Sequence, residues 1–131
     1  MKSIKNYSEK DLPGLSIKQK RSKKTYDALI KTGFNLLKTR EYDSITVAEL
    51  SKAADYSVGA FYTRFQSKDE FFDALVIHHF KTRNAHLDRL FSTSHNDDFA
   101  DVLIKDIVNY FRINQKFWRA ALKRSMRDPD F

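Results

Sequence analysis

The sequence contains no cysteine, two prolines and three glycines, and it has no apolar run of the length that spans a membrane. The lack of cysteine excludes disulfide bonds, thiol catalysis and zinc sites with cysteine ligands. The amino-terminal stretch MKSIKNYSEKDLPGLS has basic residues but no apolar core, unlike a signal peptide. We therefore expect a soluble cytoplasmic protein that has no membrane among its partners.

Helix-breaking residues are scarce in the rest of the chain. No proline lies between Gly14 and Pro129, where the only glycines are Gly33 and Gly59. Apolar residues recur at helical spacing in segments separated by short polar stretches. The pattern predicts an all-α protein with helices over about residues 18–39, 46–54, 58–65, 67–91 and 99–112 and from about 115 onward.

Capping residues mark the expected starts of three helices. Thr46 with Glu49, and Ser67 with Glu70, have the three-residue spacing of a capping box, and Ser57 is suited to cap the helix that follows it. Two short capped helices with a tight turn between them, flanked by longer helices, are typical of a helix-turn-helix. In that motif the second short helix enters the major groove of DNA.

The second short helix has a composition that suits close approach to DNA. Gly59 costs about 0.5–1 kcal/mol relative to alanine inside a helix, and Ala60 adds only a methyl group, so the two residues make a low surface. Tyr62, Thr63 and Arg64 follow and have the length to reach phosphates or base edges around it. This helix is therefore interpreted as the recognition helix.

With these residues in place, the segment from about residue 21 to residue 75 resembles the DNA-binding domain of tetracycline-repressor (TetR) family regulators. The matching positions include Thr46, Val47, Leu50, Ala54, Ser57, Gly59, Ala60, Phe61, Tyr62, Phe65 and the run SKDE at 67–70. The resemblance implies that Thr46 and Lys68 hold phosphates, that Tyr62 packs along the DNA backbone, and that residues 57–60 with Thr63 face bases. The candidate DNA-binding residues are Thr46, Val47, Tyr56, Ser57, Val58, Gly59, Ala60, Tyr62, Thr63, Arg64, Lys68, Lys20, Arg21 and Lys24.

Four positions depart from the family pattern. Glu41 stands where a glycine is usual, so the turn after the first helix is either strained or of another geometry. Asp55 replaces a turn glycine, a milder change because aspartate tolerates left-handed conformations. Arg64 replaces a common histidine and would still grip a phosphate. Tyr56 replaces a small apolar residue, with its hydroxyl toward DNA or its ring over the core.

The net charge of +7 is concentrated at the amino terminus. Residues 1–24 hold eight lysines and arginines and two acidic residues, a net charge of +6. Five of these cations lie in KQKRSKK, residues 18–24, where the first helix begins. Such a basic arm is suited to contact a polyanion, and the alternative is a solvated tail that aids solubility.

The chain is predicted to comprise a flexible tail (1–17), a helix-turn-helix domain (18–67) and a helical ligand-sensing and dimerisation domain (68–131) that looks incomplete. The resemblance implies that this last domain encloses a small, apolar effector and that intact chains form homodimers on a double-stranded DNA operator. The alternative for its apolar residues is an ordinary core stripe. The candidate effector-pocket residues are Phe80, Leu87, Phe99, Phe111, Phe117 and Trp118.

Other chemistry finds little support in the sequence. Adjacent histidines His78 and His79 point about 100° apart on a helix, and Arg83 stands where a partner ligand four residues after His79 would be. The carboxylates are accompanied by no nucleophile or phosphate-binding loop. We therefore expect no enzyme, metal or cofactor, and the sequence favours a ligand-responsive DNA-binding repressor. The rival is a basic helical module that meets an acidic protein or a membrane surface.

Overall fold

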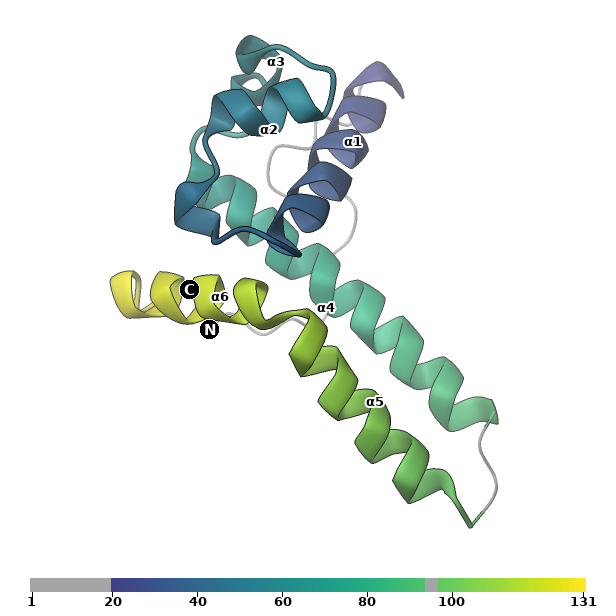
Figure 1. Ribbon diagram of the computed structural model, residues 1–131. Helices are drawn as coiled ribbons and strands as arrows, with labels where there is room; N and C mark the ends of the chain where they lie inside the picture. Colours follow the sequence, from purple (N-terminus) through teal and green to yellow (C-terminus); the bar gives the residue numbers. More distant parts are fainter. Residues whose placement is uncertain (1–19, 94–96) are drawn as a thin grey trace.

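The computed structural model describes residues 20–93 and 97–131, and the predicted tail, residues 1–17, lies outside them. Over the described residues every regular element is helical, which confirms the all-α prediction (Figure 1). The elements are α1 (Lys20–Leu37), the 3₁₀ turn η2 (Tyr42–Ser44), α2 (Val47–Ala53), α3 (Val58–Tyr62), α4 (Lys68–Thr93), α5 (Phe99–Ile113) and α6 (Gln115–Arg127).

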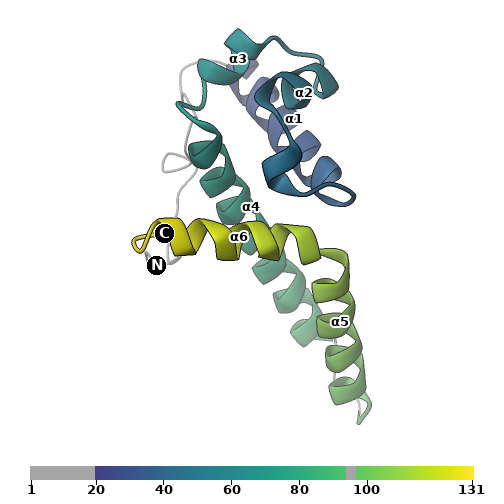
Figure 2. The same ribbon diagram turned by 60° about the vertical axis from the view of Figure 1, so that its left-hand side comes forward.

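The helices form a small head, made of α1 to α3, and a long stem, made of α4 and α5. Helices α1, α2 and α3 gather at one end of the molecule, and α4 leads away from them (Figure 1). Helix α5 returns alongside α4, and α6 crosses α4 below the head (Figure 2). In both views α3 lies at the end of the molecule opposite to α5. A partner of α3 therefore approaches from the side away from α5.

Aromatic residues around the start of α4 make the core of the head. Phe61, Phe65 and Phe71 are fully buried, with ring centroids 5.0–5.4 Å apart. Gly33 of α1 allows this cluster to form, because a Cβ there would lie 2.9 Å from Cζ of Phe71. Leu29, one turn earlier on α1, is also fully buried. The core thus holds α3 against α1 and α4, although α3 is too short to be stable alone.

Helix ends agree with the capping predictions at two of three positions. Thr46 and Glu49 form the complete capping box of α2, and the Ser57 hydroxyl accepts from the backbone N–H of Ala60. At α4 the Ser67 hydroxyl accepts from Glu70 N at 3.1 Å, but the Glu70 carboxylate accepts from the backbone of Gln66 instead of Ser67.

Helix α3 ends earlier than predicted. It closes at Tyr62 with Thr63 as its carboxyl-terminal cap, whereas the sequence predicted helix to about Phe65. Phe65 remains fully buried without being helical. The burial of its ring satisfies the apolar pattern that was attributed to a longer helix.

The turn residues explain two departures from the family pattern. Glu41 has φ −68° and ψ 140°, so its turn is extended and unstrained, which is the second of the two alternatives. Asp55 has φ 62° and is, within residues 20–93 and 97–131, the one non-glycine residue with positive φ. This confirms that aspartate takes the left-handed conformation in the turn between α2 and α3.

Candidate nucleic-acid interface

The amino terminus of α2 is closed by its own side chains. Glu49 N donates to the Thr46 hydroxyl at 3.1 Å, and Thr46 N donates to the Glu49 carboxylate at 2.9 Å. Arg40 reaches the same carboxylate at 3.4 Å and also donates to the carbonyl of Ser44 at 2.6 Å. These bonds hold the pKa of Glu49 below its ordinary value, with the Thr46 backbone bond as the main cause. Thr46 is exposed, and its hydroxyl serves the cap.

The exposed side of α3 is nearly free of side-chain bulk. A Cβ built on Gly59 would meet only the Ser57 hydroxyl, at 3.8 Å. Ser57 and Gly59 are exposed, Val58 is 41% exposed, and Ala60 is half-buried. Residues 57–60, four of the five residues predicted to face bases, therefore lie together on a surface that a second molecule can approach at backbone distance.

Aromatic and hydroxyl side chains border this surface. Tyr62 is 53% exposed, with its ring at right angles to buried Phe61 at 5.3 Å between centroids. Thr63 is exposed, and its hydroxyl donates to the carbonyl of Gly59 at 2.8 Å. Tyr56 and Val47 are half-buried, and Val47 packs against the core. Tyr62 is thus the large exposed side chain at this edge.

Arg64 is turned inward onto α1. Its Nε donates to the carbonyl of Ser22 at 3.2 Å, and its Nη1 donates to the carbonyl of Ala60 at 2.9 Å. The guanidinium therefore ties the end of the recognition segment to the first turn of α1, a role that the sequence did not suggest. Its reach to a phosphate stays a prediction.

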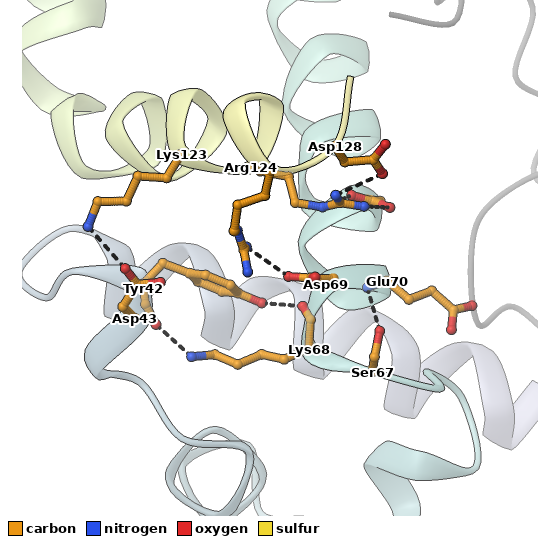
Figure 3. A network of polar contacts seen from close by, with 11 residues as sticks. Tyr42, Asp43, Ser67, Lys68, Asp69, Glu70, Lys123, Arg124 and Asp128 are labelled. Atoms are coloured by element: carbon orange, nitrogen blue, oxygen red, sulfur yellow. Dashed lines mark hydrogen bonds and ion pairs between the residues drawn. The ribbon is translucent and has the colours of Figure 1, made fainter. Parts of the chain in front are cut away.

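Lys68 has close partners inside the head. Its ammonium donates to the carbonyl of Tyr42 at 2.8 Å and lies 4.6 Å from the centre of that ring, while the Tyr42 hydroxyl donates to the carbonyl of Lys68 at 2.6 Å (Figure 3). Burial lowers the pKa of Lys68 from its ordinary value. The predicted phosphate contact by Lys68 requires this side chain to be shared between Tyr42 and DNA, and it stays a prediction.

The basic start of α1 lies beside the end of α3, joined to it by the bond between Arg64 and Ser22. Lys24 is exposed there. The side chains of Lys20 and Arg21, two further predicted contacts, lie outside the described part of the structure. The segment that holds α2 and α3 is electrically neutral, since residues 47–64 include two acidic and two basic side chains. Attraction to a polyanion must therefore come mainly from the arm at residues 18–24.

A bridge of ion pairs joins α6 to the head on its other side. The Glu41 carboxylate accepts from Lys116 at 2.9 Å and from Arg119 at 2.6 Å, and Lys123 reaches Asp43 at 3.0 Å. Lys116 is the main cause that lowers the pKa of Glu41.

The bridge continues along α6 to the first turns of α4. Arg124 contacts Asp73 at 3.2 Å and Arg127 contacts Asp69 at 3.1 Å, and Arg124 also pairs with Asp128 at 2.9 Å (Figure 3). These pairs, the two pairs of Glu41 and the pair of Asp43 together define the α6 bridge. It was not predicted, because the pairs that join α6 to the head and to α4 link residues far apart in sequence.

The predicted effector residues differ in how deeply they are buried. Phe117 is buried and packs on Phe72 at 5.7 Å, so it belongs to the core. The ring centroid of Trp118 lies 5.9 Å from that of Phe80 and 5.6 Å from that of Phe111. Phe111 is nevertheless 50% exposed.

The two remaining predicted effector residues, Leu87 and Phe99, lie further from the head, on α4 and α5. Phe99 packs on Phe91, 5.2 Å between ring centroids, and Leu87 is half-buried. None of the six predicted residues lines the cavity of about 380 Å³ between α4 and α5, which is lined mostly by residues with polar side chains. Enclosure of an effector by these six side chains therefore stays a prediction.

Neither a metal site nor a membrane span is found in the described ranges. Among residues 20–93 and 97–131, no three His, Cys, Asp or Glu side chains are placed to hold a metal ion. No helix in the same ranges is long and apolar enough to cross a membrane.

Comparisons with known proteins match the head of the molecule. Residues 29–75, which run from α1 into the first turns of α4, match the family model described as bacterial regulatory proteins, tetR family. A segment of 47 residues is 51% identical to an uncharacterized HTH-type transcriptional regulator, YwcC, of Bacillus subtilis (strain 168). That match spans 36% of this chain and 21% of the relative, so about a fifth of the relative's length is covered. No solved structure matches the chain.

Proposed function

We propose that the chain is a transcription regulator of the tetR family that binds a duplex DNA operator sequence-specifically, from the match of residues 29–75 to the model of that family. The observation that carries the proposal is the open surface of α3 at Gly59, bordered by the half-exposed Tyr62. A helix with that surface fits the major groove, where base edges are read at close range.

Each side chain of this surface has a role in the proposed complex. Tyr62 packs along the sugar-phosphate backbone, and the small side chains of residues 57–60 allow base edges to come close to α3. Thr63 adds a hydroxyl at the same edge. Lys24 and its neighbours in the basic arm supply phosphate contacts beside α3, which contribute affinity and not sequence preference.

We further propose that the protein is a ligand-responsive repressor that acts as a homodimer. Two copies present two α3 helices, which read two half-sites of a palindromic operator. An effector shifts the balance between conformations that do and do not fit this spacing. The α6 bridge supports this proposal, because it ties the head to a helix that directly follows α5.

The test is selection of bound sequences from a random duplex pool at near-physiological salt, with the Tyr62→Ala variant in parallel. Phe91→Ala is the matched control, because Phe91 is also an aromatic residue that is 53% exposed and it lies at the far end of α4. Circular dichroism and thermal melting establish that all three proteins are folded.

Three outcomes are distinguishable. A palindrome enriched by the wild type and by Phe91→Ala but lost with Tyr62→Ala supports a dimeric reader that uses the proposed face. Enrichment of a lone half-site supports the DNA reader and contradicts the dimer. Absence of enrichment contradicts sequence-specific binding and favours the rival, a basic module that meets acidic proteins or membrane surfaces.

A further inference from the structure

The cavity between α4 and α5 is lined by polar faces of both helices. Its wall includes His79, Arg83 and His86 of α4, spaced four and three residues apart, and Asp106 and Tyr110 of α5, spaced four apart. Residues at these spacings share one face of a helix. The two polar faces are therefore directed at one another, with about 380 Å³ between them, within the size range of small-molecule sites.

Acceptor atoms of the wall are largely occupied. The two carboxylate oxygens of Asp106 accept from Arg83 at 2.6 Å and from His86 at 2.7 Å. The Arg83 bond, followed by the His86 bond, holds the pKa of Asp106 below its ordinary value, so the carboxylate is ionised at neutral pH. The carbonyl oxygen of the Asn109 side chain accepts from Arg112 at 2.7 Å. A ligand that carries positive charge thus finds the single carboxylate of the wall already paired, and the side chains of Thr82 and Asn114 offer only neutral acceptors.

Donor groups, by contrast, remain in surplus. Arg83 uses one of its terminal nitrogens on Asp106 and lies 4.0 Å from the centre of the Tyr110 ring, which leaves several N–H groups for a ligand. Arg89 also lines the cavity, and its guanidinium forms no ion pair with any residue in the described ranges. The amide nitrogen of Asn109 is a further donor.

The formal charge of the cavity wall is positive, which favours an anionic ligand as the surplus of hydrogen-bond donors does. Arg83 and Arg89 face a single carboxylate, that of Asp106, which gives a formal charge of +1 with histidines neutral. Ile113 and the Tyr110 ring supply apolar surface beside these groups. An acceptor-rich anion with an apolar body satisfies all of them, because guanidinium groups bind carboxylates through paired hydrogen bonds.

From this arrangement we infer that the cavity between α4 and α5 binds a small organic anion, a carboxylate attached to an apolar body. Its role as the effector of the regulator rests on the proposed function, whereas the binding itself doesn't. The inferred ligand differs from the apolar effector that the sequence suggested, because Phe80 and Phe111 each pack on Trp118 and none of the three lines this cavity.

The test compares probes of one shape and three charges. The probes are benzoate, benzamide and benzamidine, together with the two-ring set 2-naphthoate, 2-naphthamide and 2-naphthamidine. Binding to the DNA-free protein is measured by calorimetry and by the fluorescence of Trp118, the single tryptophan, whose ring lies 6.3 Å from that of Tyr110. In at least one set the carboxylate is expected to bind about three- to tenfold more tightly than the amide, and the amidine most weakly.

Variants with opposite expected effects separate ligand contact from damage to the fold. Arg89→Gln removes a positive charge from the wall and is expected to weaken carboxylate binding about two- to fivefold. Asp106→Asn removes the negative charge and is expected to strengthen it. Lys81→Gln is the matched control, because Lys81 is exposed on α4 away from the cavity wall, and its binding is expected to equal that of the wild type.

Several results would overturn the inference. Equal affinities of acid and amide in both sets, tighter binding of an amidine, or the absence of saturable binding of every probe up to about 10 mM would each do so. Equal loss with Arg89→Gln and Lys81→Gln would place the binding elsewhere. Operator selection is carried out without these probes, so failure of the inference and failure of the proposed DNA-binding function are separately visible.

Discussion

The same substitution, glycine to alanine, is expected to have opposite effects on stability at two helical positions. Alanine is favoured over glycine in a helix by about 0.5–1 kcal/mol. At Gly59 the added Cβ meets only the Ser57 hydroxyl at an ordinary 3.8 Å, so Gly59→Ala retains this gain. Because Gly59 lies near the start of a five-residue helix, the lower end, about 0.5 kcal/mol, is expected.

At Gly33 the same methyl group meets the core. It would lie 2.9 Å from Cζ of Phe71, 3.1 Å from Cε1 of that ring and 3.2 Å from Cδ2 of Leu75. Both neighbours are 0% exposed, so neither can swing outward. Overpacking of this kind costs about 1–3 kcal/mol, which outweighs the gain in helix propensity and gives a net loss of about 1 kcal/mol.

Thermal unfolding of the wild type and the two variants measures these effects. A change of 1 kcal/mol corresponds to about 4–8 °C in Tm for domains of 60–100 residues and to about 2–4 °C for 150–250 residues, so for this chain the variants should differ by several degrees and lie on opposite sides of the wild type. A Gly33→Ala protein as stable as the wild type would refute the packing argument at Phe71.

The operator affinity of Gly59→Ala then tests function separately from folding. The variant is expected to be at least as stable as the wild type but to bind its operator about tenfold more weakly, or about 1.4 kcal/mol, since the methyl group stands on the surface proposed to meet bases. Unchanged operator affinity in a stabilised Gly59→Ala protein would show that Gly59 does not approach DNA closely.

Three further predictions follow from other features. Burial, with a smaller contribution from Arg83, lowers the pKa of His79 from 6.5 to about 4, so on acidification the unfolded chain binds a proton before the folded chain does. Acidification from pH 7 to pH 5 should therefore lower the free energy of unfolding by about 2 kcal/mol, measured by urea unfolding, and His79→Gln should reduce this pH dependence. Asp55→Val should destabilise by about 1–2 kcal/mol because of φ 62°, whereas Asp55→Gly should be tolerated, and denaturant midpoints of the two variants test this. Reversal of the charges at 20, 21, 23 and 24 should flatten the salt dependence of operator binding measured by fluorescence anisotropy, and an unaltered slope would exclude the arm from the interface.

Local features were predictable from sequence because they depend on neighbours. The caps at Thr46 and Ser57 involve residues three positions away, and the left-handed Asp55 follows from the chemistry of its own side chain. The burial of Phe61 followed from apolar spacing, which also placed Phe65 in the core although it did not place the end of α3. Helix existence was thus predicted better than the last residue of a short helix.

Features that depend on distant partners were not predictable. Arg64 has the composition of a phosphate contact, yet it bonds to the carbonyl of Ser22, 42 positions earlier. Glu41 meets Lys116 across 75 positions, and nothing near either residue signals the pair. Arg83 and His86 share a face of α4 at helical spacing, but their common partner Asp106 lies 20 or more positions away on α5.

The α6 bridge has a consequence for any measurement of DNA affinity against salt. Its pairs join mostly exposed side chains, such as Lys123, 58% exposed, and Asp43, 65% exposed, which dissolved salt screens. Counterions that accumulate at the bridge loosen α6 from the head over the same range of ionic strength in which counterions displace the arm from phosphates. The slope of a logarithmic plot is then the sum of an intermolecular and an intramolecular contribution. The number of phosphates contacted is obtained only after the intramolecular contribution is subtracted, and Asp43→Asn with Lys123→Gln measures the share of the most exposed pair of the bridge.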